Sequence, residues 1–487
     1  MRFQKRKVCA RFARFSALFM GGLALAAFAF GLTPAHAESL KRALASTYVG
    51  NPTLNAERAA LRAIDEEISQ ARSNFRPSLS GDLDTGYRNT NPKSKSRATT
   101  RGLTTGGGTH HPKNFSLTLS KSLFRGFRTL NAIREAEATI QSGRATLRNV
   151  EQSVLLDAVT AYMDVFRDQA IVRLRESNVR VLSEQQKATK DRFEVGEVTK
   201  TDVAQAEARR SGAVSDLNLA QSNLKTSRAA YQRVIGHPPS NLVEPQSIES
   251  LLPHVLQVAL STSEAENPII VAAIYTEKAS RYAVKQIIGE MLPELSVEAT
   301  ISDSLEPSVS LERDSERRIT GRLRVPLYTR GEPSSRARQA RQTNAQRRRE
   351  IDEARRQAKA DVIAAWGRLI AARAQIESDQ AQVRANKIAL NGVKEEEKVG
   401  QRTLLDVLDA EQELLDSQVA LVSTQRDRVV AAYTLLSAIG RMDAHFLRLP
   451  VEHYDPMEYY DKIKHKLFGT YADRQEREQY RRERITR

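Results

Sequence analysis

Cysteine is almost absent from this chain of 487 residues, which contains only Cys9. Cys9 lies in a basic and apolar leader that we expect to be removed, so the mature chain should have no thiol. Disulfide bonds, cysteine catalysis, thiolate metal sites and lipidation of an N-terminal cysteine are then excluded. Aromatic residues are also few, at 6% with a single tryptophan, which suits long helices better than a thick globular core.

Long apolar runs are equally scarce, and the one from Ala17 to Leu32 is in the leader. Six basic residues precede it and Ala35-His36-Ala37 follows it, which is typical of a secretory signal peptide, residues 1–37, cleaved after Ala37. A retained membrane anchor is the alternative interpretation. Cleavage would lower the formal net charge of +16 by six, because the leader holds no acid. No later stretch resembles a spanning helix, so strands or surface helices must make any membrane contact.

One sequence pattern occurs twice. Val195–Glu207 can be laid on Val399–Glu411 without a gap, and the match continues to Gly236 and Gly440. Asn51-Pro52 and Pro77-Ser78-Leu79-Ser80 are likewise echoed by Asn267-Pro268 and Pro293-Glu294-Leu295-Ser296. We therefore predict two homologous halves, residues 38–245 and 246–442, each starting with a helix pair, and a C-terminal segment, 443–487, with a disordered tail.

Apolar and polar residues alternate after each of these prolines. The apolar members are Leu79, Leu83, Phe115, Leu117 and Leu119 in the first half and Leu295, Val297, Ile301, Ile319 and Leu323 in the second. Alternation with period two predicts strands with one apolar and one polar face. Each half should contain one β-hairpin. The first hairpin should have a long polar loop, Asn89 to Asn114, and the second a charged loop near Asp303 to Arg318.

Two very long helical tracts follow the strands, at Arg128–Arg192 and Pro333–Lys398. At ~1.5 Å per residue each would reach nearly ~100 Å, which no single globule can bury. Leu408, Leu415, Val422 and Val429 recur every seven residues, as in coiled-coil seams. The turns at Val195-Gly196 and Val399-Gly400 should reverse the chain into antiparallel helical hairpins.

Four two-faced strands pose a physical problem in lipid, where every backbone N–H and C=O must be paired. A sheet with two open edges cannot stand alone there, so closure needs further chains. About eight strands leave little lumen, whereas about twelve strands from three copies would enclose a passage. The strand pattern therefore favours an oligomeric pore, although two-sided strands also occur in soluble sandwiches.

The repeated motifs resemble the TolC family of outer-membrane efflux and type I secretion channels over Ser39–Met442. The resemblance rests on Arg192–Val203, Val399–Ala410, the Asn-Pro breaks, the Pro-x-Leu-Ser strand entries and the Arg-Gly strand exits. It implies an α+β membrane protein: a homotrimer whose four strands per chain form a 12-stranded β-barrel in outer-membrane lipid, continued by a long periplasmic α-helical barrel.

The resemblance also implies how such a conduit works. It would act with a periplasmic adaptor (membrane fusion) protein and an inner-membrane RND or ABC transporter, which supplies the energy. It would pass drugs, toxic compounds or polypeptides, without covalent chemistry and without a cofactor. A periplasmic coiled-coil adaptor or scaffold is the alternative function, although an adaptor needs neither the four strands nor a duplicated hairpin.

Asp406 and Asp409 are the candidate pore residues. They are three apart on a helix, hence on one face, and a trimer would bring six such carboxylates together at a closed tip. The resemblance places this pair at the periplasmic constriction, makes Asp202 and Arg402 gate links, and makes the two turns adaptor-docking surfaces. The docking residues are Val195, Gly196, Thr199, Val399, Gly400 and Thr403.

Helix capping is the competing interpretation for two of these acids. Thr199-x-x-Asp202 and Thr403-x-x-Asp406 both have the spacing of a capping box. Asp409 has Gln205 as its twin, so capping does not explain it and a pore role is favoured. Glu397 stands where some family members have a gate tyrosine; its acidic cluster could replace that link or be solvated helix surface, which we favour.

Other functions receive little support from the sequence. His110 and His111 are adjacent in a glycine-rich loop, where exposed side chains are the rule, so a metal site is not predicted. The basic balance does not indicate nucleic-acid binding, because the positive charge is spread along exported helices without interleaved aromatics.

Overall fold

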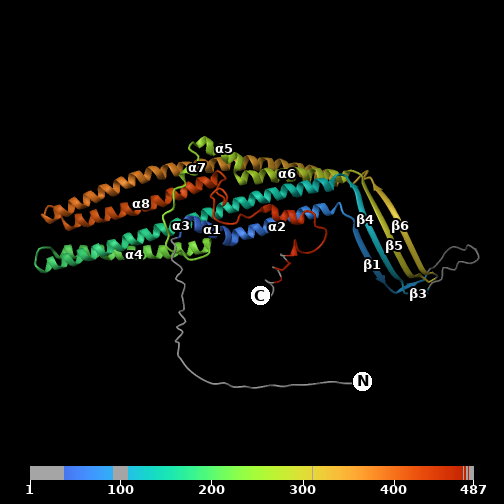
Figure 1. Cartoon of the computed structure of the whole chain (residues 1–487), viewed down its shortest axis with the longest axis horizontal. Coiled ribbons are helices and arrows are strands. Elements are labelled where there is room, and N and C mark those ends of the chain that lie inside the picture. Colours follow the sequence, from blue (N-terminus) through green and yellow to red (C-terminus); the bar gives the residue numbers. More distant parts are fainter. Residues whose placement is uncertain (1–37, 92–107, 310, 475–476, 479–480, 482–487) are drawn as a thin grey trace, which may run out of the picture.

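The computed structural model describes residues 38–91, 108–309, 311–474, 477–478 and 481. The molecule is elongated, with a β-sheet at one end and the tips of two helical hairpins at the other (Figure 1). The signal peptide predicted for residues 1–37 and most of the tail beyond Gln475 lie outside the described residues. Within the described residues, no helix is both long and apolar enough to cross a membrane.

Each half begins with a helix pair broken at an Asn-Pro step, as predicted. The pairs are α1 (Leu40–Gly50) with α2 (Pro52–Ser73), and α5 (Leu256–Glu266) with α6 (Pro268–Ile288). The Asn51 side chain accepts from Thr53 N at 2.9 Å and donates to Val234 O at 2.9 Å. Asn267 donates to Ala438 O at 3.0 Å in the same way. Each asparagine therefore caps one helix and fastens it to the end of its own hairpin.

The strands form one antiparallel sheet of order β1-β4-β5-β6. They are β1 (Ser78–Thr85), β4 (Lys113–Arg125), β5 (Glu294–Ser308) and β6 (Leu311–Arg324). Leu79, Leu119, Ala299 and Ile319 lie opposite one another across the strands, and the next row, Ser80, Thr118, Thr300 and Arg318, is polar. The two-faced strands are thus confirmed, and β4 joins β5 to link the halves.

The predicted second loop is wrong. β5 continues to Ser308 and β6 starts at Leu311, so most of Asp303–Arg318 is strand. Polar residues occupy both faces here, and charged residues pair across the strands, as Arg313 Nη2 does with Asp303 Oδ2 at 2.6 Å. The hairpin therefore extends beyond its apolar part. The predicted first loop also contains short strands, β2 (Arg88–Thr90) and β3 (Gly108–His110), while its residues 92–107 are not described.

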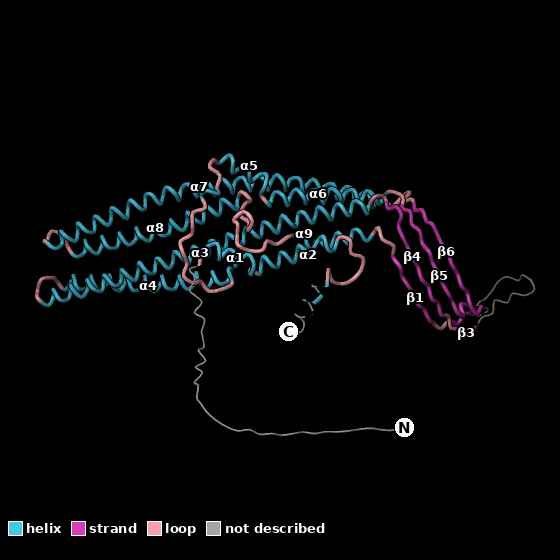
Figure 2. The backbone as a smooth tube through the Cα atoms, viewed as in Figure 1, coloured by secondary structure: helices cyan, strands magenta, loops and turns pink. Residues whose placement is uncertain are grey.

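Two 67-residue helices, α3 (Arg128–Glu194) and α7 (Glu332–Lys398), run from the sheet to the tips. Each returns as a shorter antiparallel helix, α4 (Lys200–Ile235) and α8 (Leu404–Ala438), so the predicted hairpins are confirmed (Figure 2). Gly236 and Gly440, with φ of 99° and 88°, end these return helices in the left-handed conformation that glycine adopts most easily.

The main core lies at mid-length, where α1, α3, α4 and α8 meet the segment after Gly440. Tyr162 is fully buried there, and its hydroxyl lies 2.6 Å from Val243 O. The C-terminal segment adds a short helix that the sequence did not predict, α9 (Pro456–Ile463). Ile463 is buried against α2 and α3 in a second cluster with Ile68 and Ile140, so this segment packs along the first half.

Candidate functional site

The two hairpin turns lie at the same end of the molecule (Figure 1). Gly196 and Gly400 have φ of 84° and 77°, a conformation that side chains with a Cβ rarely adopt. The flanking Val195 and Val399 are 72% and 70% exposed. Both turns therefore present an apolar side chain to the surroundings on a backbone that glycine fixes.

Asp202 and Asp406 each close a capping box. Asp406 Oδ2 accepts from Thr403 N at 2.9 Å, and Asp406 N donates back to Thr403 Oγ1 at 3.3 Å. The pKa of Asp406 is lowered, chiefly by the backbone N–H and hydroxyl of Thr403 and then by Arg402. Thr199 and Asp202 repeat the arrangement at the start of α4. Capping, the competing interpretation, is present in both halves.

Asp409 has a different partner. Its carboxylate forms an ion pair with Arg209 of α4, so it joins the second hairpin to the first. Arg209 was not predicted as a site residue. It lies four residues after Gln205, the twin of Asp409, and therefore one turn further along the same face of α4. That spacing assigns Arg209 to a face of α4, but it does not identify Arg209 as the partner of Asp409.

Further ion pairs connect the tips. Arg192 Nη1 lies 2.9 Å from Glu397 Oε1, across the two hairpins, and its Nε lies 3.2 Å from Glu197. Arg402, by contrast, pairs within its own hairpin with Glu396 at 3.0 Å, which raises its pKa. Glu397 is thus not the solvated acid that we favoured from sequence, since its side chain is only 18% exposed and links the halves.

Pairs between the halves continue towards the middle of the bundle. Arg175 lies 3.0 Å from Asp216 of α4 and 3.9 Å from Asp416 of α8. Arg426 of α8 lies 2.9 Å from Asp164 of α3. The two hairpins of one chain are therefore held together by charged contacts at several heights, in addition to apolar clusters such as the one that joins Leu182 and Ala213 to Leu404 and Leu408.

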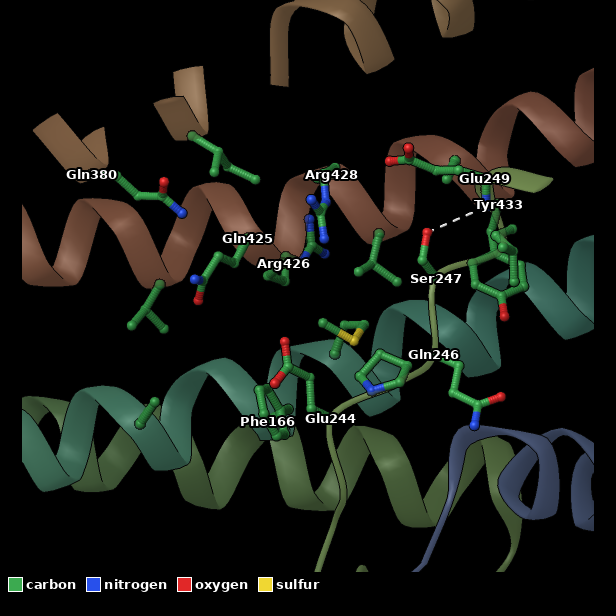
Figure 3. A pocket seen from close by; sticks show the side chains of 18 residues that line it. Phe166, Glu244, Gln246, Ser247, Glu249, Gln380, Gln425, Arg426, Arg428 and Tyr433 are labelled. Carbon is green, nitrogen blue, oxygen red and sulfur yellow. Dashed lines mark hydrogen bonds between the residues drawn. The ribbon is translucent and has the colours of Figure 1, made fainter. Parts of the chain in front are cut away.

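A cavity of about 280 Å³ lies where the connection between α4 and α5 crosses the bundle. Figure 3 shows segment 244–249 passing between α3 and α8, with Phe166, Arg426 and Tyr433 around it. Arg426 is already occupied by Asp164 and Asp427, at 2.9 and 2.8 Å. We interpret the cavity as a gap along this connection, since Arg426 and Glu249 in its lining are engaged in ion pairs with other helices.

Metal and catalytic sites receive no support in the described residues. They contain no group of three or more His, Cys, Asp or Glu placed to hold a metal ion. His110, expected to be exposed, is instead 6% exposed on β3. His110 belongs to the short β2–β3 hairpin, which the sequence did not reveal.

The geometry defines a class of protein: a two-faced β-sheet with open edges, continued by helices about 100 Å long that each end in a helical hairpin. The comparisons agree with this class. The family model described as "Outer membrane efflux protein" matches residues 43–237 and 259–441. The chain belongs to this outer membrane efflux protein family.

Relatives and solved structures extend the match along most of the chain. The outer membrane efflux protein BepC of Brucella suis is 38% identical over 434 residues, covering 89% of this chain and 92% of BepC. TolC of Escherichia coli is 23% identical, covering 87% and 85%. The Campylobacter jejuni CmeC channel structure has a TM-score of 0.75 at 16% identity, covering 88% and 90%. The TolC-like fold and an exit duct of the outer membrane are thereby confirmed.

Proposed function

We propose that this chain works as a homotrimer whose sheets close into one outer-membrane barrel and whose hairpins form one periplasmic tube. The observation that supports this proposal most strongly is the form of the sheet. Its outer strands, β1 and β6, each have an unpaired edge, and its apolar face is exposed. Leu83 and Ile319 on that face are 78% and 81% exposed. Such a surface is stable in lipid only if the edges are paired, and three copies supply about twelve strands.

The hairpin tips are the proposed periplasmic gate. Asp406 and Asp409 of three chains would form an acidic constriction that selects cations, and Asp202 and Arg402 would link neighbouring hairpins. The capping role of Asp406 is compatible with this, because capping holds a carboxylate charged and fixed at the helix start. Arg209 would reduce the negative charge of this constriction, since it forms an ion pair with Asp409.

The partners follow from the proposed assembly. The turns at Val195-Gly196-Glu197-Val198-Thr199 and Val399-Gly400-Gln401-Arg402-Thr403 would dock a periplasmic adaptor. An inner-membrane RND or ABC transporter would supply the energy, and the duct itself would perform no enzymatic reaction. The exposed valines beside rigid glycine turns support the docking proposal, because they present apolar contact area in a fixed shape.

Small toxic compounds and drugs are the proposed cargo. The support is the match to BepC, an outer membrane efflux protein, over most of both chains. Polypeptide secretion is the second candidate, because the alkaline protease secretion protein AprF of Pseudomonas aeruginosa is 24% identical over 349 residues. A deletion strain that gains drug sensitivity supports efflux, whereas one that loses secreted proteins supports secretion.

Planar-bilayer recordings of the purified protein test the gate. Asp406→Ala with Asp409→Ala should lower cation over anion selectivity and weaken block by divalent cations, because the constriction loses its negative charge. Arg209→Gln should move selectivity the opposite way, since it frees the Asp409 carboxylate.

Glu377→Ala is the matched control, an exposed acid of α7 outside the contacts described above that should leave selectivity nearly unchanged. An unaltered selectivity in a correctly assembled Asp406 and Asp409 double variant would contradict the pore assignment.

A further inference from the structure

The polar face of the sheet is divided into two sections of opposite charge. The helix-side section carries Arg318, Arg322 and Arg324 on β6, with Glu298 and Glu294 on β5, and Glu294 is already paired with Arg125 and Arg128. The distal section, further from the helices, carries Asp82 and Asp84 on β1 with Asp314 and Glu316 on β6. The arginines lie on β6 alone, whereas the distal acids lie on the two outer strands, β1 and β6.

Strand register places these residues on one face. Glu316 lies opposite Ser302, Ser302 opposite Ser116, and Ser116 opposite Asp82. The next distal row joins Asp314, Ser304, Asn114 and Asp84 in the same manner. On the helix side, Arg322 lies opposite Ser296, an even number of residues from Ser302 and hence on the same face.

Most of these charges are not neutralised by neighbours. In the part of the chain that the structure describes, Asp82, Asp84 and Asp314 are exposed and form no ion pair. Arg318 lies 3.6 Å from Glu316, which marks the boundary between the sections. On the opposite face, Asp303 is bound by Arg313 at 2.6 Å, so these two charges offset each other and take no part in the division.

The two sections are far enough apart to act separately. Ser296 and Ser302 are six positions apart along β5, which is about 20 Å at ~3.3 Å per residue. This exceeds the screening length of about 8 Å at physiological ionic strength. Three copies around one lumen would repeat each section as a ring, and rings of one sign within low-dielectric walls produce potentials of several kT.

We propose that this charge step sets which ionic solutes enter the barrel from either side. The distal section attracts cations and holds back external anions, while the arginines collect anionic cargo that arrives from the helices. The inference rests on the proposed function, because it requires the polar face to line the passage. It assigns a specificity-determining role to Asp82, Asp84, Asp314 and Glu316, and an opposite role to Arg318, Arg322 and Arg324.

Single cysteines at two depths measure the local potential without depending on the gate. Ser302→Cys reports the distal section and Ser296→Cys the helix-side section, each with Cys9→Ser so that no other thiol exists. The purified oligomer is treated with a cationic and an anionic methanethiosulfonate of similar size. The ratio of the two rates cancels differences in the reactivity of the thiol itself.

The cation-to-anion rate ratio should be about tenfold higher for the Ser302→Cys variant than for the Ser296→Cys variant at low salt, and this difference should shrink in about 1 M salt. Asp82→Asn with Glu316→Gln should lower the ratio at position 302 and leave position 296 nearly unchanged. If both thiols react fast and the cation-to-anion rate ratios at positions 296 and 302 are equal, the charge step is overturned while the proposed function still stands.

Ala299→Cys, on the apolar face, is the control that tests whether water reaches only the polar face. Its thiol should react slowly with both reagents, because lipid or detergent covers it. If the thiols at the two polar-face positions react as slowly as the one at position 299, the polar face is not an aqueous wall, and the proposed function fails together with the charge step.

Discussion

The long helices α3 and α7 have the same length and the same place in their halves, but they bury different residues. α3 buries large side chains such as Leu155, Val159 and Tyr162 against α1, α4 and the C-terminal segment. α7 buries 11 residues against 21 in α3, and its alanines at seven-residue spacing, Ala358, Ala365 and Ala372, alternate with Val362, Leu369 and Ile376. The first half therefore builds the core of one chain, whereas the second leaves most of its long helix exposed and available for another copy.

The strand exits show the same contrast. Gly126, with φ of 57°, touches the second half so closely that a Cβ would overlap the carbonyl oxygen of Gly289. Gly331, with φ of 77°, has no atom within 4 Å of such a Cβ. The repeated Arg-Gly motif thus has two structural roles, a tight backbone contact in the first half and a conformational turn in the second.

Gly126→Ala should be the most damaging change that we predict. It adds a clash with the Gly289 backbone to the strain of a left-handed residue, for a cost of more than about 3 kcal/mol. Gly331→Ala should cost only about 1 kcal/mol, since it introduces strain without a clash. Thermal unfolding of the purified variants measures both, and equal losses would remove the contrast between the two exits.

Buried carboxylates also differ between the halves. Asp65 of α2 is fully buried, and burial raises its pKa to about 6 despite the opposing effect of Arg144. Glu277 of α6 is 4% exposed, and its pKa is lowered. Burial opposes that lowering, but hydrogen bonds from Arg281, Asn344 and Arg348 outweigh it. Burial therefore disfavours the charged form of Asp65, whereas the hydrogen bonds to Glu277 stabilise its charged form.

These carboxylates predict opposite responses to pH. Because the pKa of Asp65 is raised in the folded protein, the free energy of unfolding should fall as the pH rises from about 4 through about 6. Asp65→Asn should abolish that fall and stabilise the protein at pH 7.5 by about 2 kcal/mol. A lowered pKa means that stability is present above about 4.5 and lost below it, so Glu277→Gln should destabilise at pH 7.5 by about 1 kcal/mol.

Unfolding followed between about pH 4 and pH 8 distinguishes the two variants. Changes of the same sign at pH 7.5 would show that the two acids do not differ as described.

Sequence patterns predicted most elements of this fold because their periodicity is strong. The long helices were placed within two residues at each end, and the helix pairs were identified from Asn51-Pro52 and Asn267-Pro268. The charged part of β5 and β6 carries polar residues on both faces, so it lacks the alternation that predicts a strand. Helix α9 is too short to show a period.

At the hairpin tips, local contacts could be predicted from the sequence, but contacts between the hairpins could not. Capping boxes depend on residues three apart, so Thr199 with Asp202 and Thr403 with Asp406 could be recognised. The pairing of Asp409 with Arg209 joins residues that are distant along the chain. One sequence gives no register between two hairpins, and so the partner of Asp409 could not be inferred.

The mass of the protein extracted from outer membranes in detergent tests the central claim most directly. Light scattering with correction for bound detergent should give three chains, because only further copies can pair the open edges of β1 and β6. A periplasmic adaptor or scaffold would instead be recovered without detergent. A single chain, or a soluble periplasmic species, would contradict the trimeric conduit.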